Sequence, residues 1–269
     1  MVAAEEKIAG LTAWDHLSAT YADASGAEII LVGDSLSMTI RGDADTLGID
    51  LDDMIYHSKM VSKGVRRALV VSDMPFMSYQ VSSTQALESA GRFIKEAGVE
   101  AVKIEGGSEM AKTASRIIGA GIPVMGHIGL KPQSVNQIGG MKVQGRTLSE
   151  AKAIIDDAGA LERAGVFAIV LECVPAELSS IITESLEVPT IGIGAGLGCD
   201  GQIQVTADLL GLLEKDPPKH AREYLDAKGL IKGALQDYVK DVKNSSFPEE
   251  SNAFQAAGEV MDAIRNKKI

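Results

Sequence analysis

Short runs of branched apolar residues recur along the chain, and most of them end in polar or glycine-rich sequence. A clear example is Ile29–Val32, which Gly33, Asp34 and Ser35 follow. Four apolar residues in succession are typical of a strand buried on both faces, and the glycine lets the backbone turn. The pattern therefore predicts a buried strand with Asp34 and Ser35 at its carboxyl end.

The other apolar runs repeat this arrangement. The remaining predicted strands are 8–12, 69–73, 101–105, 123–128, 167–172, 189–193 and 202–205. Their carboxyl ends carry Asp73, Lys103 with Glu105, His127 and Glu172. If the strands are parallel neighbours, these side chains converge with Asp34 on one rim.

Segments with helical spacing or helix-capping residues alternate with these strands. The predicted helices are 15–25, 52–64, 84–98, 107–120, 148–165, 175–186, 221–240 and 250–267. Two segments, Leu36–Asp50 and Lys131–Arg146, read as long glycine-containing loops. Such long connections between a strand and a helix are often working loops or lids.

The alternation of strands and helices predicts an α/β fold, either a (β/α)8 TIM barrel or a doubly wound sheet. We favour the barrel, because polar residues follow many strands rather than one switch point. The expected organisation is a single barrel domain over residues 1–269 with a C-terminal helical extension over about 221–269.

Composition supports an aliphatic barrel and narrows the function. Of 269 residues, 45% are apolar but only 4% are aromatic, so Val, Ile and Leu must fill the core. The formal net charge of −11 argues against a nucleic-acid partner and means that an anionic substrate needs a local cation. There is no signal-peptide pattern and no apolar run of membrane-spanning length, which favours a cytoplasmic protein without a membrane partner.

The acids at the strand ends suit a hard cation. Asp34, Asp73 and Glu105 offer carboxylate oxygens, and Mg²⁺ takes one or two carboxylates while leaving room for water and substrate oxygens. The alternative for Asp34 and Asp73 is a role as helix N-caps. Lys103 shares a strand face with Glu105, and its acidic neighbours favour binding of a substrate charge over Schiff-base chemistry.

Glu172 and His127 are candidates for proton transfer. A buried carboxylate at position 172 would have a raised pKa, which suits proton transfer; the alternative is a salt-bridged structural glutamate. His127 is either a base or a buried histidine with satisfied nitrogens.

Three further features have simpler interpretations. We expect Cys173 to be a small core residue and His220 to lie on a helix or at the surface. The alternating glycines of Gly192–Gly196 form either a backbone cradle for an anion or other ligand, or a tightly packed turn.

Six motifs in a fixed order carry a family resemblance: Val32–Ser35, Ser72–Phe76, Val102–Gly107, Gly126–Leu130, Leu171–Pro175 and Ile191–Gly196. The series spans nearly the whole chain and resembles the ketopantoate hydroxymethyltransferases. Departures include Ser37, where the family usually has glycine, and Lys131, where it usually has threonine.

The resemblance implies a barrel of the phosphoenolpyruvate/pyruvate type and an activity. The activity is transfer of a hydroxymethyl group to 3-methyl-2-oxobutanoate, forming ketopantoate in the first step of pantothenate and coenzyme A biosynthesis. The implied one-carbon donor is 5,10-methylenetetrahydrofolate or a modified tetrahydropterin. The resemblance also implies a homo-oligomer, often a decamer.

Site roles follow from the same resemblance, position by position. Asp34 and Asp73 would be Mg²⁺ ligands, and Glu105 would be associated with the metal, partly through water. Ser35 and Lys103 would bind the keto acid together with the two aspartates. Glu172 would be the catalytic proton acceptor, with His127 in support.

Two other functions stay open at this point. One is a Mg²⁺-dependent C–C lyase of the same superfamily, although the chain has no Lys-Lys-Cys-Gly-His loop of the kind typical of such lyases. The other is a barrel that binds a keto acid without catalysis.

Overall fold

The computed structural model describes residues 6–266. Residues 1–5, which belong to the acidic start of the chain, and Lys267, the last residue of the predicted helix 250–267, lie outside this range. The chain divides into two compact units, residues up to Tyr224 and residues from Leu225 onward.

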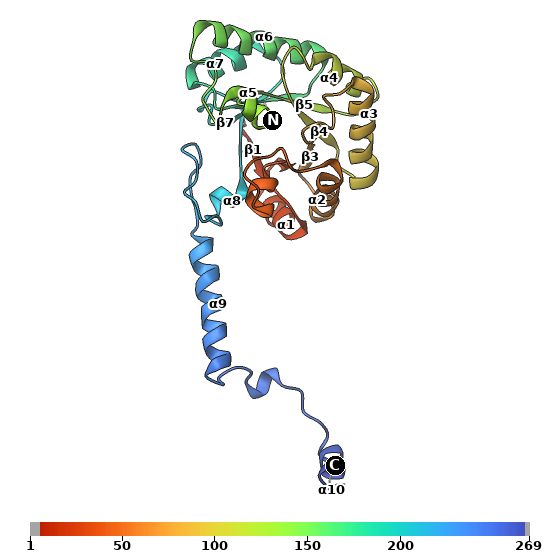
Figure 1. The fold of residues 1–269 in the computed structure, drawn as a ribbon, viewed down its shortest axis with the longest axis vertical. Coiled ribbons are helices and arrows are strands. Elements are labelled where there is room, and N and C mark those ends of the chain that lie inside the picture. The colour runs from red at the N-terminus through yellow and green to blue at the C-terminus, as the bar shows by residue number, and fades with distance from the viewer. Residues whose placement is uncertain (1–5, 267–269) are drawn as a thin grey trace. The chain divides into compact units, whose positions relative to one another are not determined.

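Eight parallel strands form a closed barrel in which each strand pairs with the next along the chain and the last pairs with the first. Figure 1 shows the helices arranged around the strands. The strands are β1 (Ile8–Thr12), β2 (Ile29–Val32), β3 (Leu69–Asp73), β4 (Ala101–Glu105), β5 (Val124–Gly129), β6 (Ala168–Glu172), β7 (Thr190–Ile193) and β8 (Gly201–Gln204). The predicted (β/α)8 barrel is confirmed.

The helices of the barrel unit are α1 (His16–Ala24), α2 (Leu51–Gly64), α3 (Ser83–Arg92), α4 (Ala111–Ile118), α5 (Val135–Ile138), α6 (Leu148–Ala164), α7 (Ala176–Ser185) and α8 (Thr206–Leu209). Side chains of Asp15, Asp50, Ser82 and Thr147 accept hydrogen bonds from the backbone at the starts of α1, α2, α3 and α6. These caps explain why the predicted starts lie close to the observed ones.

The differences from the predicted helices are local. The predicted helix 84–98 is α3 followed by a π-helical turn, Phe93–Ala97. The predicted loop 36–50 contains a π-helical turn, Ser37–Arg41. The predicted loop 131–146 contains a 3-10 turn, Pro132–Ser134, and the short helix α5, which ends at Gly139 with a φ of 74°.

Two apolar layers hold the barrel. Ile29, Leu31, Val71 and Met125 belong to one buried cluster formed mainly by strand residues. A larger cluster joins strand residues such as Ile30 to helix residues such as Leu161. Because successive strand residues point to opposite faces, continuous apolar runs can supply both layers.

Strand register aligns the polar ends of the strands. Asp73 of β3 pairs with Lys103 of β4, and Glu105 of β4 pairs with His127 of β5. The register therefore places two acidic side chains, a lysine and a histidine on three adjacent strands at one end of the barrel.

The second unit holds α9 (Ala227–Lys243), a 3-10 turn (Glu250–Asn252) and α10 (Gly258–Asn266). The predicted helix 221–240 begins later because Asp226 caps α9 by accepting a hydrogen bond from the Gly229 amide. The predicted helix 250–267 is a 3-10 turn and a separate short helix. None of the helices that the structure describes has the length and apolar character to cross a bilayer.

Candidate active site

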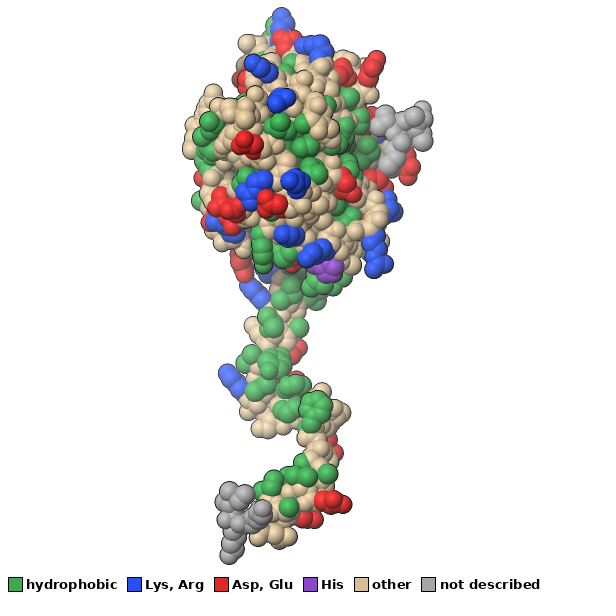
Figure 2. Space-filling view, turned by 90° about the vertical axis from the view of Figure 1, so that its right-hand side faces the viewer, with side chains coloured by type: hydrophobic (Ala, Val, Ile, Leu, Met, Phe, Trp, Pro, Cys, Tyr) green, Lys and Arg blue, Asp and Glu red, His purple; other side chains and the backbone are tan. Residues whose placement is uncertain are grey.

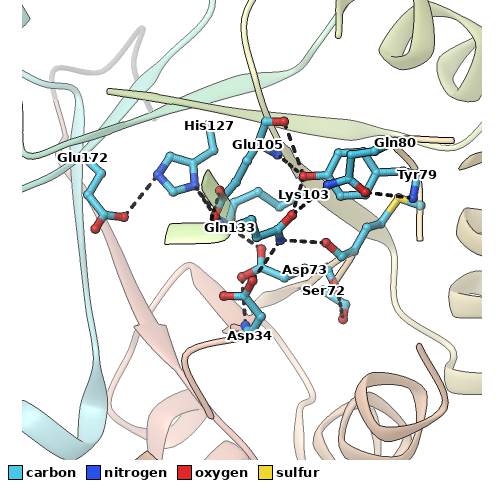
Figure 3. A network of polar contacts seen from close by, with 11 residues as sticks. Asp34, Ser72, Asp73, Tyr79, Gln80, Lys103, Glu105, His127, Gln133 and Glu172 are labelled. Atoms are coloured by element: carbon cyan, nitrogen blue, oxygen red, sulfur yellow. Dashed lines mark hydrogen bonds and ion pairs between the residues drawn. The ribbon is translucent and has the colours of Figure 1, made fainter. Parts of the chain in front are cut away.

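The polar ends of strands β2 to β6 meet around one cavity of about 960 Å³. Figure 3 shows most of these side chains directed toward one another. The predicted site residues that line the cavity are Asp34, Ser35, Asp73, Lys103, Glu105, His127 and Glu172. The predicted convergence is therefore confirmed for the six ionisable side chains, and Ser35 lines the same cavity.

Asp34 and Asp73 are buried beside each other. The Asp34 amide donates a 3.0 Å hydrogen bond to Asp73 Oδ2. Gly33 precedes this contact in a tightly packed turn, since a Cβ there would lie 3.1 Å from Ser35 Oγ. Neither aspartate caps the start of the next helical segment: Ser37–Arg41 has no side-chain cap and α3 is capped by Ser82, so the N-cap alternative is wrong.

Burial and mutual repulsion perturb these acids. Burial, together with the Asp73 carboxylate, raises the pKa of Asp34 to about 7. Burial and then the Asp34 carboxylate raise the pKa of Glu105 well above its ordinary value. Such a set of acids favours a bound cation, since a positive charge relieves both effects.

Lys103 is the cation that the sequence indicated. Its Nζ lies 2.8 Å from Asp73 Oδ1 and 3.1 Å from His127 Nδ1, and the side chain is buried. Burial alone would lower the pKa of Lys103, but Asp73, Glu105 and Asp34 outweigh it and raise that pKa above its ordinary value. Lys103 therefore stays charged, which favours charge binding over a Schiff base.

His127 bridges Lys103 and Glu172. Because the Lys103 ammonium can only donate, it sets His127 Nδ1 as the acceptor and places the ring proton on Nε2. His127 Nε2 lies 3.1 Å from Glu172 Oε2, within ion-pair distance but without the alignment of a hydrogen bond. Burial, followed by the Lys103 charge, lowers the pKa of His127, so the ring is neutral.

Glu172 differs from the other acids in its access to the cavity. Its side chain is 16% exposed, whereas the side chains of Asp73 and Glu105 are 5% and 4% exposed. The Glu172 backbone packs against Gly129, which has a φ of 90°. A Cβ at Gly129 would lie 2.3 Å from the Glu172 carbonyl oxygen. Gly129 thus lets β5 end tightly against the Glu172 backbone.

Two site residues were not found from the sequence. The Gln133 side-chain amide donates hydrogen bonds to Asp34 Oδ2 (2.8 Å) and to the Met74 carbonyl (3.0 Å). The Gln133 backbone amide donates to Glu105 Oε2 (3.0 Å). The Tyr79 hydroxyl donates to Gln133 Oε1 (2.7 Å) and accepts from the Glu105 amide (3.0 Å). Their signal was weak, because Gln133 lies in a segment without periodicity.

The acids fit a magnesium ion. Within residues 6–266 there is no group of three His, Cys, Asp or Glu side chains that could hold a metal by themselves. Mg²⁺ needs only one or two carboxylates, and the contact of the buried Asp73 Oδ1 with Lys103 Nζ, at 2.8 Å, lacks the alignment of a hydrogen bond. Asp34 and Asp73 are thus the fitting ligands, whereas Glu105 Oε2 already accepts a hydrogen bond from the Gln133 backbone amide.

Other cavity residues correct the sequence interpretation. Cys173 is half-buried and lines the cavity with a φ of 49°, so it is not a core residue. His220 also lines the cavity, and a Cβ at Gly194 would lie 3.2 Å from its Cβ. A Cβ at Gly196 would lie 2.4 Å from Ala176 Cβ, so close packing accounts for both glycines.

The two departures from the family pattern have local partners. Ser37 is fully buried and its hydroxyl donates to Asp43 Oδ2 (2.6 Å). Lys131 forms a 3.2 Å ion pair with Glu109. Neither side chain forms a hydrogen bond or ion pair with Asp34, Asp73 or Glu105.

Comparison with known proteins gives a consistent result. The model of the family described as "Ketopantoate hydroxymethyltransferase" matches residues 1–250. A 3-methyl-2-oxobutanoate hydroxymethyltransferase of Carboxydothermus hydrogenoformans is 53% identical over 98% of this chain and 96% of its own length. The enzyme of that name from Clostridium botulinum (strain 657 / Type Ba4) is 52% identical over 96% of this chain and 94% of its own.

Solved structures support the fold. A phosphonopyruvate hydrolase aligns with a TM-score of 0.62 at 12% identity, over 99% of this chain and 92% of its own. A 2,3-dimethylmalate lyase, described as a PEP mutase/isocitrate lyase superfamily member, aligns with a TM-score of 0.59 at 15% identity, over 98% and 91%.

Proposed function

This chain belongs to the ketopantoate hydroxymethyltransferase family, and we propose that its barrel transfers a hydroxymethyl group from 5,10-methylenetetrahydrofolate to 3-methyl-2-oxobutanoate. The product is ketopantoate, and this would be the first step of pantothenate and coenzyme A biosynthesis. The observation that carries the proposal is the convergence of Asp34, Asp73 and Lys103 with Glu172 on one cavity.

The buried aspartates and Lys103 provide the binding groups for a keto acid. Asp34 and Asp73 would hold Mg²⁺, with Glu105 contributing through water. When bound, the ion supplies Lewis-acid stabilisation of negative charge on the 2-oxo oxygen. Ser35 and Lys103 bind the substrate carboxylate, and the Lys103 charge compensates an anion in an otherwise acidic site.

Glu172 accepts the proton from C3 of the keto acid. The electron pair of that C–H bond then forms the new bond from C3 to the methylene carbon of the carrier. Water supplies the hydroxyl oxygen as the two bonds from the methylene carbon to the carrier nitrogens break. The C3 proton and one proton of the water pass to those nitrogens, so that tetrahydrofolate leaves. His127 Nε2 lies 3.1 Å from Glu172 Oε2, and the neutral ring leaves the glutamate as the proton acceptor.

Two further properties belong to the proposal. We propose a homo-oligomer, a decamer by family likeness, because α9 exposes Leu230, Ile231, Leu235 and Tyr238 in the single chain. Figure 2 shows hydrophobic side chains along this C-terminal unit. We also propose a cytoplasmic location, which suits the two free cysteines.

Deuterium exchange at C3 of 3-methyl-2-oxobutanoate, followed by NMR with and without Mg²⁺, tests the proposal. The carrier is then added to the same tube. Metal-dependent exchange followed by ketopantoate supports it. Exchange without product keeps the proton transfer and indicates another carrier, such as a modified tetrahydropterin. The absence of both exchange and product would overturn the proposal in favour of a lyase or a non-catalytic binder.

A further inference from the structure

A second set of polar side chains lines the same cavity outside the acid cluster. Asp208 of α8 is only 9% exposed, and Gln204 lies four residues before it at the end of β8. Thr46, from the loop after β2, is 1% exposed. All three line the cavity, and none belongs to the network of Figure 3.

These side chains have unused hydrogen-bonding capacity. Gln204 Oε1 and Thr46 Oγ1 are buried without a partner. The Gln204 amide orientation is set by its Nε2, which donates to the His220 carbonyl (3.3 Å), so the oxygen is the unpaired atom. Among residues 6–266, none donates a hydrogen bond to the Asp208 carboxylate, and burial raises its pKa despite the nearby Lys215 and His220.

Unpaired buried acceptors are costly, so their presence in a cavity wall indicates a ligand that donates hydrogen bonds. The keto acid cannot be that ligand, because its anion carries oxygen acceptors and no N–H group. A pterin has the required chemistry: its 2-amino group and N3–H lie side by side and suit a carboxylate that accepts two parallel hydrogen bonds.

The cavity also has room for a second ligand. Pockets of roughly 300 to 1,000 Å³ hold drug-sized molecules, and this one measures about 960 Å³. A five-carbon keto acid at Asp34 and Asp73 leaves most of that volume free. The wall that carries Gln204 and Asp208 includes apolar side chains such as Ile203, Val205 and Leu213, which suit the faces of a flat ring.

We propose that Asp208, with Gln204, binds the 2-amino-4-oxopyrimidine edge of the pterin in the one-carbon carrier. This inference rests on the proposed function and adds the location of the carrier's ring. The hydroxyl of Thr46 supplies a third polar contact in the same cavity.

Isothermal titration calorimetry on the full chain tests the inference with two probes. 6-Methyltetrahydropterin contains the ring without the tail, and p-aminobenzoylglutamate contains the tail without the ring. Asp208→Asn should weaken 6-methyltetrahydropterin binding about tenfold or more, the loss expected for a hydrogen bond to a charged group. The same variant should bind p-aminobenzoylglutamate as the parent does, and Asp208→Glu should recover part of the loss.

Asp156→Asn is the matched control, because it removes the same charge from an exposed position on α6. It should leave both affinities unchanged. An Asp208→Asn protein that binds 6-methyltetrahydropterin within twofold of the parent would overturn the inference, as would a loss confined to p-aminobenzoylglutamate. Should Asp208→Asn fail to fold, Gln204→Leu takes its place. We expect this variant to lose affinity for 6-methyltetrahydropterin, and an unchanged affinity would overturn the inference.

The C3 exchange assay separates this inference from the proposed function. If the parent neither exchanges the C3 proton nor forms ketopantoate, the proposed function fails whatever the pterin affinity. If the parent forms ketopantoate and Asp208→Asn keeps the parent KM for the carrier, only the pterin subsite is wrong.

Discussion

The side-chain amide of Gln133 donates a 2.8 Å hydrogen bond to Asp34 Oδ2, although 99 residues separate the two along the chain. This contact joins the segment after β5 to the turn after β2. It also occupies one oxygen of a buried aspartate, which leaves the other oxygen as the free ligand atom. The Gln133 side chain therefore decides that Asp34 Oδ1 is the oxygen available to a ligand.

Gln133→Leu should lower kcat/KM for the keto acid by about tenfold and the free energy of unfolding by about 1 to 3 kcal/mol. The variant removes donors from Asp34 and the Met74 carbonyl and leaves buried acceptors unpaired. Steady-state kinetics and urea unfolding measure the two effects. Parent values in both would show that the contact does not position Asp34.

Asp73→Ala should abolish Mg²⁺-dependent turnover, because it removes a proposed ligand and the partner of Lys103. Turnover is measured across a magnesium titration, with Asp156→Ala as the exposed control. Full activity of Asp73→Ala would remove this residue from the metal site.

Glu172→Gln should bind the keto acid with parent affinity but lose turnover by a factor of about 10² or more, the usual contribution of a general base. Calorimetry gives the affinity and the C3 exchange assay gives the rate. Unchanged exchange would show that another group takes the proton.

Asp34 should make the metal-free protein less stable as pH rises. Its pKa is about 7 when folded and near 3.8 when unfolded, so the folded state binds the extra proton between these values. The stabilisation is complete below about pH 4 and is lost as pH rises through 7, at up to about 1.4 kcal/mol per pH unit.

Urea unfolding in EDTA at several pH values, for the parent and for Asp34→Asn, measures this effect. The parent should lose more stability than the variant between about pH 5 and pH 7.5. Excess Mg²⁺ should flatten the parent profile, because the ion favours the ionised carboxylate. Parallel profiles for the two proteins in EDTA would contradict the raised pKa.

Cys173 should react slowly with iodoacetamide. Burial and then the Glu172 carboxylate raise the pKa of its thiol to about 11, so at about pH 8 roughly one molecule in a thousand carries the reactive thiolate. The alkylation rate should rise about tenfold per pH unit up to about pH 10. Mass spectrometry follows the modification, with Cys173→Ser as the control, and a plateau near pH 9 would indicate an ordinary thiol.

Much of this architecture could be predicted from the sequence because parallel strands bring their carboxyl ends together. Apolar runs ending in Asp73, Glu105 and Glu172 were sufficient to place those side chains on one rim. The barrel was favoured over a doubly wound sheet because polar residues follow many strands rather than one switch point, and the residue types at the strand ends indicated the chemistry.

The remaining features depend on contacts that no local pattern contains. Gln133 and Tyr79 join the site through the folding of irregular segments, whose conformation has no hydrophobic period. His220 was expected at the surface because a single histidine after a proline pair carries no signal of the cavity that it lines. The start of α9 depends on Asp226 as its cap, which lies inside the predicted helix.

Closure of the barrel has a consequence for how the protein is made. β1 forms its second ladder with β8, from Ile8 with Gly201 to Leu11 with Gln204. A chain on the ribosome therefore carries two open sheet edges until residue 204 has emerged, and open edges invite pairing with other chains. Synthesis of the last strand therefore closes the barrel and ends the period in which aggregation is the greatest risk.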